Sequence, residues 1–339
     1  MENQLTPRTN TELFGHSETE AALMRDIAAG KLAHGLIFSG TRGIGKVTMA
    51  YRIARTLLSG AARIAANSHS DLLVIEPLYD EKKDELASEI SVDQAREIPQ
   101  FLSLTAGEGA WRMVIIDSAD ALNNNAANAI LKILEEPPPR TILILISHNV
   151  NRLLPTIRSR CRLVSFAPLA NDDFKSAMRL IAPEIYGDEL SALAALAVGS
   201  VGVALELRNQ GAVKLYAETL ELLASAPEFD GALLLRYCEQ IGSGKKAHAN
   251  WQLFMRVMLA ILERTAKISL GAKINAISDD ELQNLQQLAA LHSAEIWAQK
   301  WQNAAAQLSV AQALHLDYKQ VALTFFHSIV SVEEFSLAA

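Results

Sequence analysis

Apolar runs and helical patterns alternate over the first 166 residues of the chain. The runs at 35–39, 72–75, 113–116, 142–146 and 163–166 are apolar at consecutive positions rather than at alternate ones. Consecutive apolar residues are typical of strands that are buried on both faces of a sheet. Because helical patterns separate these runs, we predict an α/β domain with a parallel sheet covered on both sides.

Capping residues and prolines predict where helices of this domain begin and end. Ser17 and Glu20 have the spacing of a capping box at a helix start. A second helix is predicted over residues 46–58. The prolines at 137–139 end a third helix, which begins near Asn124, because proline cannot continue the hydrogen-bond ladder.

From about Pro168 onward the strand signals stop and only helical patterns remain. Short helices precede Gly211 and longer amphipathic patterns follow it, of which residues 295–330 are long enough for two helices. The chain is therefore predicted to contain three parts: an α/β domain at 1–167, a small helical (lid) domain at 168–211 and an all-α C-terminal domain at 212–339.

Composition and charge exclude several classes of protein. The 339 residues are 50% hydrophobic and 20% charged, which suits packed cores and excludes wholesale disorder. The net charge of −7 gives no overall basic field to hold nucleic acid, so no DNA-binding residues are assigned. Cys161 and Cys238 are too few for a disulfide framework or a four-cysteine zinc site. No secretory signal or membrane span is evident, so a cytoplasmic protein is expected.

Residues 40–46 read Gly-Thr-Arg-Gly-Ile-Gly-Lys and lie between a predicted strand and a predicted helix. This is the sequence context of a phosphate-binding loop. Gly40, Gly43 and Gly45 let backbone N–H groups turn inward, and the helix N-terminus adds partial positive charge. Lys46 can reach the β- and γ-phosphates of a nucleotide.

The hydroxyl that normally follows the lysine of such a loop is missing. Val47 occupies that position and offers Mg²⁺ no oxygen. Thr48 comes one residue later, about 100° further around the helix. Two interpretations remain open: a degenerate site that binds ATP weakly or without metal, or a loop that survives only as a tight turn. The candidate nucleotide-binding residues are Gly40, Gly43, Gly45, Lys46, Thr48 and Asp117.

Asp117 ends the apolar run that begins at Met113. In nucleoside triphosphatases of this layout, such an aspartate helps to hold Mg²⁺, and a glutamate often follows it to activate water. Here Ser118 follows, and a serine is a poor general base. Asp117 could instead cap a turn at the strand end, but the phosphate loop upstream favours the nucleotide interpretation.

Three further stretches resemble the clamp-loader branch of the AAA+ ATPases: Asp-Ser-Ala-Asp at 117–120, Asn-Ala-Ile-Leu-Lys-Ile-Leu-Glu-Glu-Pro-Pro at 128–138, and Leu-Leu-Pro-Thr-Ile-Arg-Ser-Arg-Cys at 153–161. The final Ser-Arg-Cys is the most specific of them. Within this branch the chain most resembles the delta-prime family of bacterial DNA polymerase III subunits. The likeness covers 15–166 well, extends through the small helical domain, and is weak in the C-terminal domain.

This resemblance implies a three-domain subunit of a five-membered ring, with the C-terminal domains forming an oligomerisation collar. The implied partners are motor and delta-type clamp-loader subunits of the polymerase holoenzyme, with the sliding clamp and primed DNA reached through the complex. It also implies no zinc, because the four-cysteine module of some relatives is absent, and residues 80–89 are expected to be a loop and a helix start.

The resemblance further implies that this chain does not hydrolyse ATP. Val47 and Ser118 replace two groups that a motor subunit uses, and Gly202 stands where such subunits carry a sensing arginine. The alternatives are an ATP-hydrolysing motor subunit of the same family and a nucleotide-binding sensor without catalysis.

Arg160 is the candidate catalytic residue, acting in trans as an arginine finger on a neighbour's γ-phosphate. The other interpretation is an ordinary surface arginine, because Arg152, Arg158 and Arg162 lie close by in the sequence. The Ser-Arg-Cys context favours the finger. Cys161 is predicted to be a small packed residue rather than a nucleophile.

Four aromatic side chains carry weaker signals. His34, ahead of the first predicted strand, could approach an adenine or could face solvent from a loop. Trp251, Trp297 and Trp301 lie on amphipathic patterns, which favours core or interface positions over base-stacking platforms.

Overall fold

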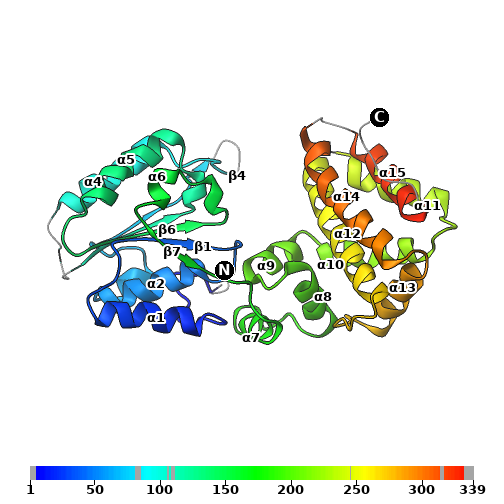
Figure 1. Cartoon of the computed structure of the whole chain (residues 1–339), viewed down its shortest axis with the longest axis horizontal. Helices are drawn as coiled ribbons and strands as arrows, with labels where there is room; N and C mark the ends of the chain where they lie inside the picture. Colours follow the sequence, from blue (N-terminus) through cyan, green and yellow to red (C-terminus); the bar gives the residue numbers. More distant parts are fainter. Residues whose placement is uncertain are drawn as a thin grey trace. The chain divides into compact units, whose positions relative to one another are not determined.

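The structure, a computed structural model, describes residues 5–80, 85–104, 107, 111–244, 246–313 and 317–331 (Figure 1). The chain divides into two compact units. The first comprises Met1–Pro183 with Gly199–Gly202, and the second comprises Glu184–Val198 with Val203–Ala339. This division does not test the three-domain boundaries, which stay a prediction.

The first unit is built on a five-stranded sheet in the order β2-β5-β6-β1-β7, with every neighbouring pair parallel. Its strands are β1 (Gly35–Ser39), β2 (Leu72–Ile75), β5 (Arg112–Asp117), β6 (Thr141–Ser147) and β7 (Arg162–Ser165). All five predicted strands are present; β1, β5 and β6 are almost entirely buried, whereas the edge strand β7 is largely exposed. The predicted α/β class is therefore confirmed.

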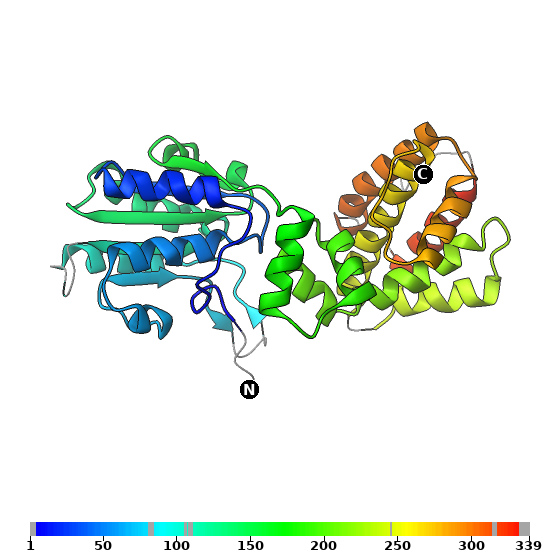
Figure 2. The same cartoon turned by 90° about the horizontal axis from the view of Figure 1, so that it is seen from below.

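Helices cover both faces of this sheet (Figure 1). Leu36 and Phe38 of β1 belong to one core cluster, whereas Ile37 between them belongs to another, as the alternation of side chains along a strand requires. Figure 2 shows α1 and α2, in blue, side by side on the first of these faces. The helices of this unit are α1 (Ser17–Ala28), α2 (Lys46–Leu57), α3 (Ala61–Ala65), α4 (Val92–Ser103), α5 (Asn124–Glu135), α6 (Pro155–Arg158) and α7 (Asn171–Ile181), with 3-10 turns η1 (Ala119–Ala121) and η2 (Val150–Arg152).

Two local predictions are wrong. Helix α1 begins at Ser17, but His16 takes the cap position without a side-chain cap, because its ring bonds elsewhere. The helix start expected within residues 80–89 is not found at Asp80 or at residues 85–89, and residues 81–84 lie outside the described part of the chain. Instead β3 (Tyr79–Asp80) and β4 (Glu85–Leu86) pair as an antiparallel ribbon, and α4 begins only after Ser91, which forms a capping box with Gln94. The predicted end of α5 before the prolines is confirmed.

The second unit is all-α, as predicted. Its longest helix, α12, packs against α10, α11, α13 and α14. Helix α9 begins in the first unit and continues into this one, and residues 295–330 form two helices, as expected. The remaining bounds are α8 (Gly187–Ala197), α9 (Val201–Asn209), α10 (Ala212–Ala224), α11 (Gly231–Gly242), α12 (Ala247–Ser269), α13 (Asp279–Ala289), α14 (Ala294–Ala313) and α15 (Tyr318–Val330).

Aromatic side chains fill the core of the helical unit. Trp251 and Trp297 are fully buried, and the ring of Trp251 stacks on Tyr318 at 5.3 Å between centroids. Trp301 is 38% exposed. The first two tryptophans are therefore core residues, as predicted.

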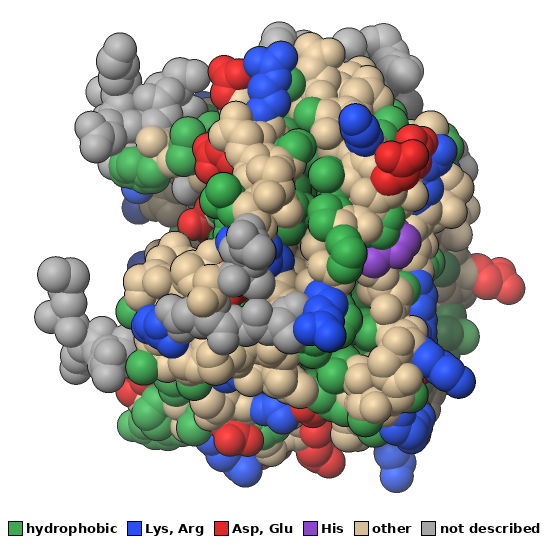
Figure 3. Space-filling model, turned by 90° about the vertical axis from the view of Figure 1, so that its left-hand side faces the viewer, with side chains coloured by type: hydrophobic (Ala, Val, Ile, Leu, Met, Phe, Trp, Pro, Cys, Tyr) green, Lys and Arg blue, Asp and Glu red, His purple; other side chains and the backbone are tan. Residues whose placement is uncertain are grey.

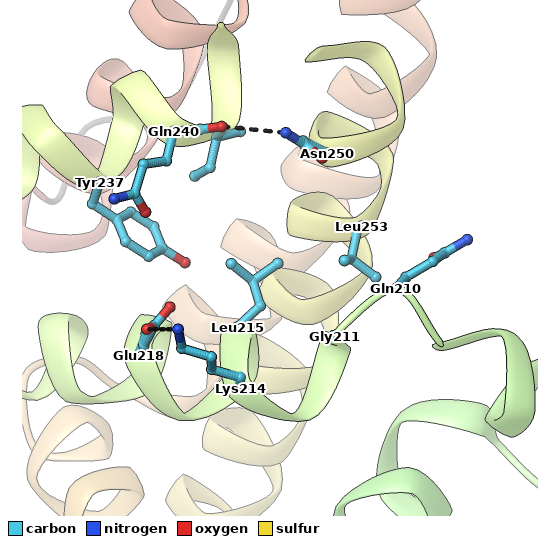
Figure 4. A pocket seen from close by; sticks show the side chains of 10 residues that line it. Gln210, Gly211, Lys214, Leu215, Glu218, Tyr237, Gln240, Asn250 and Leu253 are labelled. Carbon is cyan, nitrogen blue, oxygen red and sulfur yellow. Dashed lines mark hydrogen bonds and ion pairs between the residues drawn. The ribbon is translucent and has the colours of Figure 1, made fainter. Parts of the chain in front are cut away.

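A cavity of about 270 Å³ lies among α10, α11 and α12 (Figure 4). The Lys214–Glu218 ion pair, 3.5 Å long, lies on its α10 side, and Asn250 donates a hydrogen bond to the Gln240 carbonyl across its α11–α12 side.

Among the described helices, none alone has the length and apolar composition to cross a membrane; only α8 and α9 taken together, with a 115° bend, meet that test.

Candidate functional site

Residues 40–46 connect the carboxyl end of β1 to the first turn of α2, as a phosphate loop does. Gly40, Gly43 and Gly45 have φ angles of +151°, +76° and +106°, which side-chain-bearing residues rarely adopt. A Cβ on Gly40 would also lie 2.4 Å from the Phe166 carbonyl oxygen. The backbone conformation therefore explains the spacing of the glycines. Gly40, Gly43, Gly45 and Lys46, four of the candidate nucleotide-binding residues, lie together in this loop.

The Lys46 ammonium is directed into this loop. Its Nζ donates to the carbonyl oxygens of Gly40 at 2.6 Å and Thr41 at 2.5 Å, and the residue is 2% exposed. Burial lowers the pKa of Lys46 from 10.5 to about 8, although the negative charges of Asp117 and Asp120 act in the opposite direction. Lys46 therefore lies close enough to Asp117, the second candidate nucleotide-binding motif, for the carboxylate charge to act on its ammonium group.

The depressed pKa of Lys46 predicts a specific pH dependence of stability. Between pH 8 and 10.5 the unfolded chain binds the lysine proton more tightly than the folded chain, so the free energy of unfolding should rise with pH. Lys46→Met should remove this rise, which we expect to amount to about 1–3 kcal/mol. Urea unfolding of both proteins at pH 7.5 and 9.5 measures it; parallel pH profiles would contradict the assignment.

Asp117 and Asp120 have different roles in the structure. Burial, followed by the nearby Glu76, raises the pKa of Asp117. Asp120 accepts hydrogen bonds from the Ser147 hydroxyl at 2.7 Å and from the backbone N–H of His148 at 2.5 Å. Asp120 therefore ties η1 to the end of β6, and its carboxylate is committed to a structural contact rather than to activating water.

A segment far away in the sequence packs directly on the phosphate loop. The Gly202 N–H donates to the Gly43 carbonyl at 3.0 Å, and the Ser200 hydroxyl donates to the Arg42 carbonyl at 2.6 Å. A Cβ on Gly202 would lie 2.7 Å from the Gly43 Cα. An arginine at position 202 therefore cannot be accommodated in this arrangement, since even its first side-chain carbon overlaps the loop.

Val47 and Thr48, at the start of α2, make no contact that indicates a role in the site. Val47 is partly buried and packs against the core cluster of the α1–α2 face, and Thr48 is buried. Thr48 therefore stays a candidate on sequence grounds alone.

Sequence reasoning missed two histidines beside this loop. His16 Nε2 lies 2.8 Å from the Ile44 carbonyl oxygen and fixes the loop from the start of α1. His148 follows β6; its Nδ1 is buried without a hydrogen-bond partner in the described structure, and burial lowers its pKa. Neither position carries a recognisable motif, because both depend on contacts between distant segments.

Arg160 lies near the amino-terminal ends of the strands, whereas the phosphate loop follows the carboxyl end of β1. A Cβ on Gly35, the first residue of β1, would lie 3.5 Å from the Arg160 carbonyl oxygen, whereas the loop follows Ser39 at the other end of the strand. Five residues at roughly 3.3 Å per residue separate the two edges by about 16 Å. Figure 3 views the side of the molecule where the strands begin, and Lys and Arg side chains, in blue, are spread over it.

The guanidinium of Arg160 is held by three acceptors. Its Nη2 pairs with Glu135 Oε1 at 2.6 Å, and its Nη1 donates to the Thr156 carbonyl at 2.9 Å and the Ser159 hydroxyl at 3.3 Å. Neighbouring arginines have other partners: Arg162 pairs with Asp26, and Arg158 makes a longer contact of 3.4 Å with the Asn151 amide oxygen.

His34 and Cys161 lie at the same edge. His34 Nε2 is 3.0 Å from the Leu134 carbonyl oxygen, so the partly buried ring makes a structural contact ahead of β1, at the other end of that strand from the phosphate loop. Cys161 packs against the core cluster of the α4–α5 face, and burial raises its pKa to about 11. A thiol with that pKa is protonated at neutral pH, which agrees with the predicted packing role.

No group of three or more His, Cys, Asp or Glu side chains in the described ranges has the arrangement needed to hold a metal ion. The residues of the phosphate loop could hold a nucleotide through backbone N–H groups and Lys46.

Comparison with known proteins gives the family context. The family described as "DNA polymerase III, delta subunit" matches residues 15–170. A DNA polymerase III subunit delta′ from Pseudomonas aeruginosa is 37% identical over 203 residues, covering 56% of this chain and 60% of the relative. The Bacillus subtilis subunit delta′ is 28% identical over 300 residues, covering 85% of each chain.

The matching solved structures have lower sequence identity to this chain than these relatives do. A gamma-subunit-related protein from Thermotoga maritima is 19% identical with a TM-score of 0.41, covering 93% of this chain and 99% of that one. The RuvB branch-migration motor of the same organism is 15% identical with a TM-score of 0.43, covering 79% and 87%.

Proposed function

Because residues 15–170 belong to the DNA polymerase III delta-subunit family and the chain resembles delta-prime subunits over most of its length, we propose that it is a clamp-loader subunit that does not hydrolyse ATP. In this role it joins motor and delta-type subunits in the cytoplasm, and the assembled complex places the sliding clamp on primed DNA. Its own contribution to catalysis is Arg160, supplied in trans to the ATP of an adjacent subunit.

The observation that carries this proposal is the separation of Arg160 from the phosphate loop of its own chain. The two lie at opposite edges of one parallel sheet, about 16 Å apart by strand length. An arginine side chain cannot cross that distance, so its charge is not available to a nucleotide bound at residues 40–46. It is partly exposed at the sheet edge, where the phosphate of another subunit can approach it.

The phosphate loop supports the second half of the proposal. Val47 brings no metal-binding oxygen, Ser118 no carboxylate, and Gly202 packs its backbone on the loop where a motor subunit would need an arginine. Hydrolysis needs a metal, a positioned water and charge stabilisation of the γ-phosphate. Loss of a group for each of these functions favours a chain that does not cleave its own nucleotide.

We expect the purified chain to release no phosphate from Mg-ATP above the uncatalysed background, with Lys46→Ala indistinguishable from the parent. A self-sufficient motor subunit would instead turn over ATP and lose that turnover with Lys46→Ala. Steady-state phosphate release by both proteins separates the two functions.

Nucleotide binding without catalysis is a separate possibility that Lys46 and the loop N–H groups support. Titration with a fluorescent ATP analogue, with and without Mg²⁺, tests it. Saturable binding that Lys46→Ala weakens would assign a sensor role to the loop, and absence of binding at millimolar analogue would leave it a structural turn.

A further inference from the structure

The ion pair between Arg160 and Glu135 joins the segment that follows α6 to the last residue of α5. The two side chains are 34% and 49% exposed, and the Arg160 Nη2–Glu135 Oε1 distance is 2.6 Å. A surface pair of this exposure adds little to the stability of a fold. It does, however, place Nη2 of the Arg160 guanidinium beside Glu135 Oε1.

The contacts leave part of the guanidinium available. An arginine has five N–H donors. The described contacts use at most three of them, two on Nη1, towards Thr156 and Ser159, and one on Nη2, towards Glu135. The Nε–H and the second Nη2 hydrogen remain, and they can donate to phosphate oxygens while the other side of the group stays anchored.

Glu135 itself is held in place by the fold. It ends α5 two residues before Pro137, and the carbonyl oxygen of the preceding Leu134 lies 3.0 Å from His34 Nε2. The acceptor for Arg160 is therefore presented from a fixed helix end. Glu136, the next residue, is also exposed but forms no ion pair with the described residues.

From these contacts we propose that Glu135 is the positioning residue of Arg160: it holds the guanidinium ready for the γ-phosphate of the ATP bound by a neighbouring subunit. This inference rests on the proposed function. A long, flexible side chain loses rotamer freedom when it is fixed on a ligand. Because Glu135, Thr156 and Ser159 fix the guanidinium before the phosphate arrives, less of that freedom is lost when the transition state forms.

The test uses the full complex, assembled with motor subunits, sliding clamp and primed DNA, and compares Glu135→Ala, Glu135→Gln and the matched control Glu136→Ala. We expect kcat for DNA-stimulated ATP hydrolysis to fall about 10-fold with Glu135→Ala and about 3-fold with Glu135→Gln, which keeps an acceptor but loses the charge. Glu136→Ala should match the parent. The KM for ATP, complex assembly and the thermal midpoint of the purified subunit should not change.

A double variant distinguishes positioning from other effects. If Glu135 acts through Arg160, adding Glu135→Ala to Arg160→Ala should cause no further loss. A further loss would overturn the inference, as would a normal rate for Glu135→Ala in a complex that Arg160→Ala inactivates; in the second case the proposed function stands. A normal rate for Arg160→Ala itself would overturn both.

Discussion

Replacing Arg160 with alanine should lower ATP hydrolysis at the neighbouring site by about 10³-fold and prevent clamp loading by the complex. An arginine that reaches a transferring phosphoryl group from another subunit stabilises the negative charge that develops there, and removal of such fingers costs about 10³–10⁵ in rate. Its own phosphate loop lies at the far edge of the sheet, so the loss should appear only in the assembled complex. Phosphate release with clamp and primed DNA present measures it.

Two neighbouring arginines provide matched controls for this experiment. Arg162 pairs with Asp26 and Arg158 contacts Asn151, so neither shares the anchors of Arg160. Their alanine variants should assemble and hydrolyse ATP within about 3-fold of the parent, since exposed contacts of this kind add little to the stability of the subunit. Size-exclusion chromatography must show that the Arg160→Ala complex is intact. An intact complex with a normal rate would exclude the finger role.

The sheet was predictable from the sequence because each strand contains adjacent apolar residues, with helical patterns between the strands. The phosphate loop was predictable for a different reason: its glycines stand where the backbone has φ > 0, so their spacing records the turn itself. The two helices within 295–330 follow from the length of the amphipathic pattern. In each case the structural signal lies within a few neighbouring residues.

The contacts that define the candidate site could not be predicted in this way. Ser200 reaches the Arg42 carbonyl across 158 residues, and His34 reaches Leu134 across 100. Nothing in the local sequence of either partner encodes the other. The capping box predicted at Ser17 failed for the same reason, because the ring of His16 is engaged by Ile44 of the loop.

The Gly43→Ala variant should lose about 2–5 kcal/mol in the free energy of unfolding. Two effects combine there. The φ of +76° costs an alanine about 1–2 kcal/mol, and the added Cβ would lie 2.7 Å from the Gly202 Cα, an overlap that costs about 1–3 kcal/mol. Urea unfolding of the parent and the variant measures the sum.

Two further glycines separate these effects. Gly30 has a similar φ of +65°, and nothing lies within 4 Å of the position that an added methyl group would take, so Gly30→Ala should show the backbone cost alone. Gly202→Ala should show the steric overlap alone. Its added Cβ would lie 2.7 Å from the Gly43 Cα, and the φ of Gly202 is not left-handed. The costs of Gly43→Ala and Gly202→Ala should not add in the double variant, since relief of one overlap opens the space for the other. Equal losses for Gly30→Ala and Gly43→Ala would show that the Gly199–Gly202 segment does not press on the loop in solution. The steric argument against an arginine at position 202 would then be lost with it.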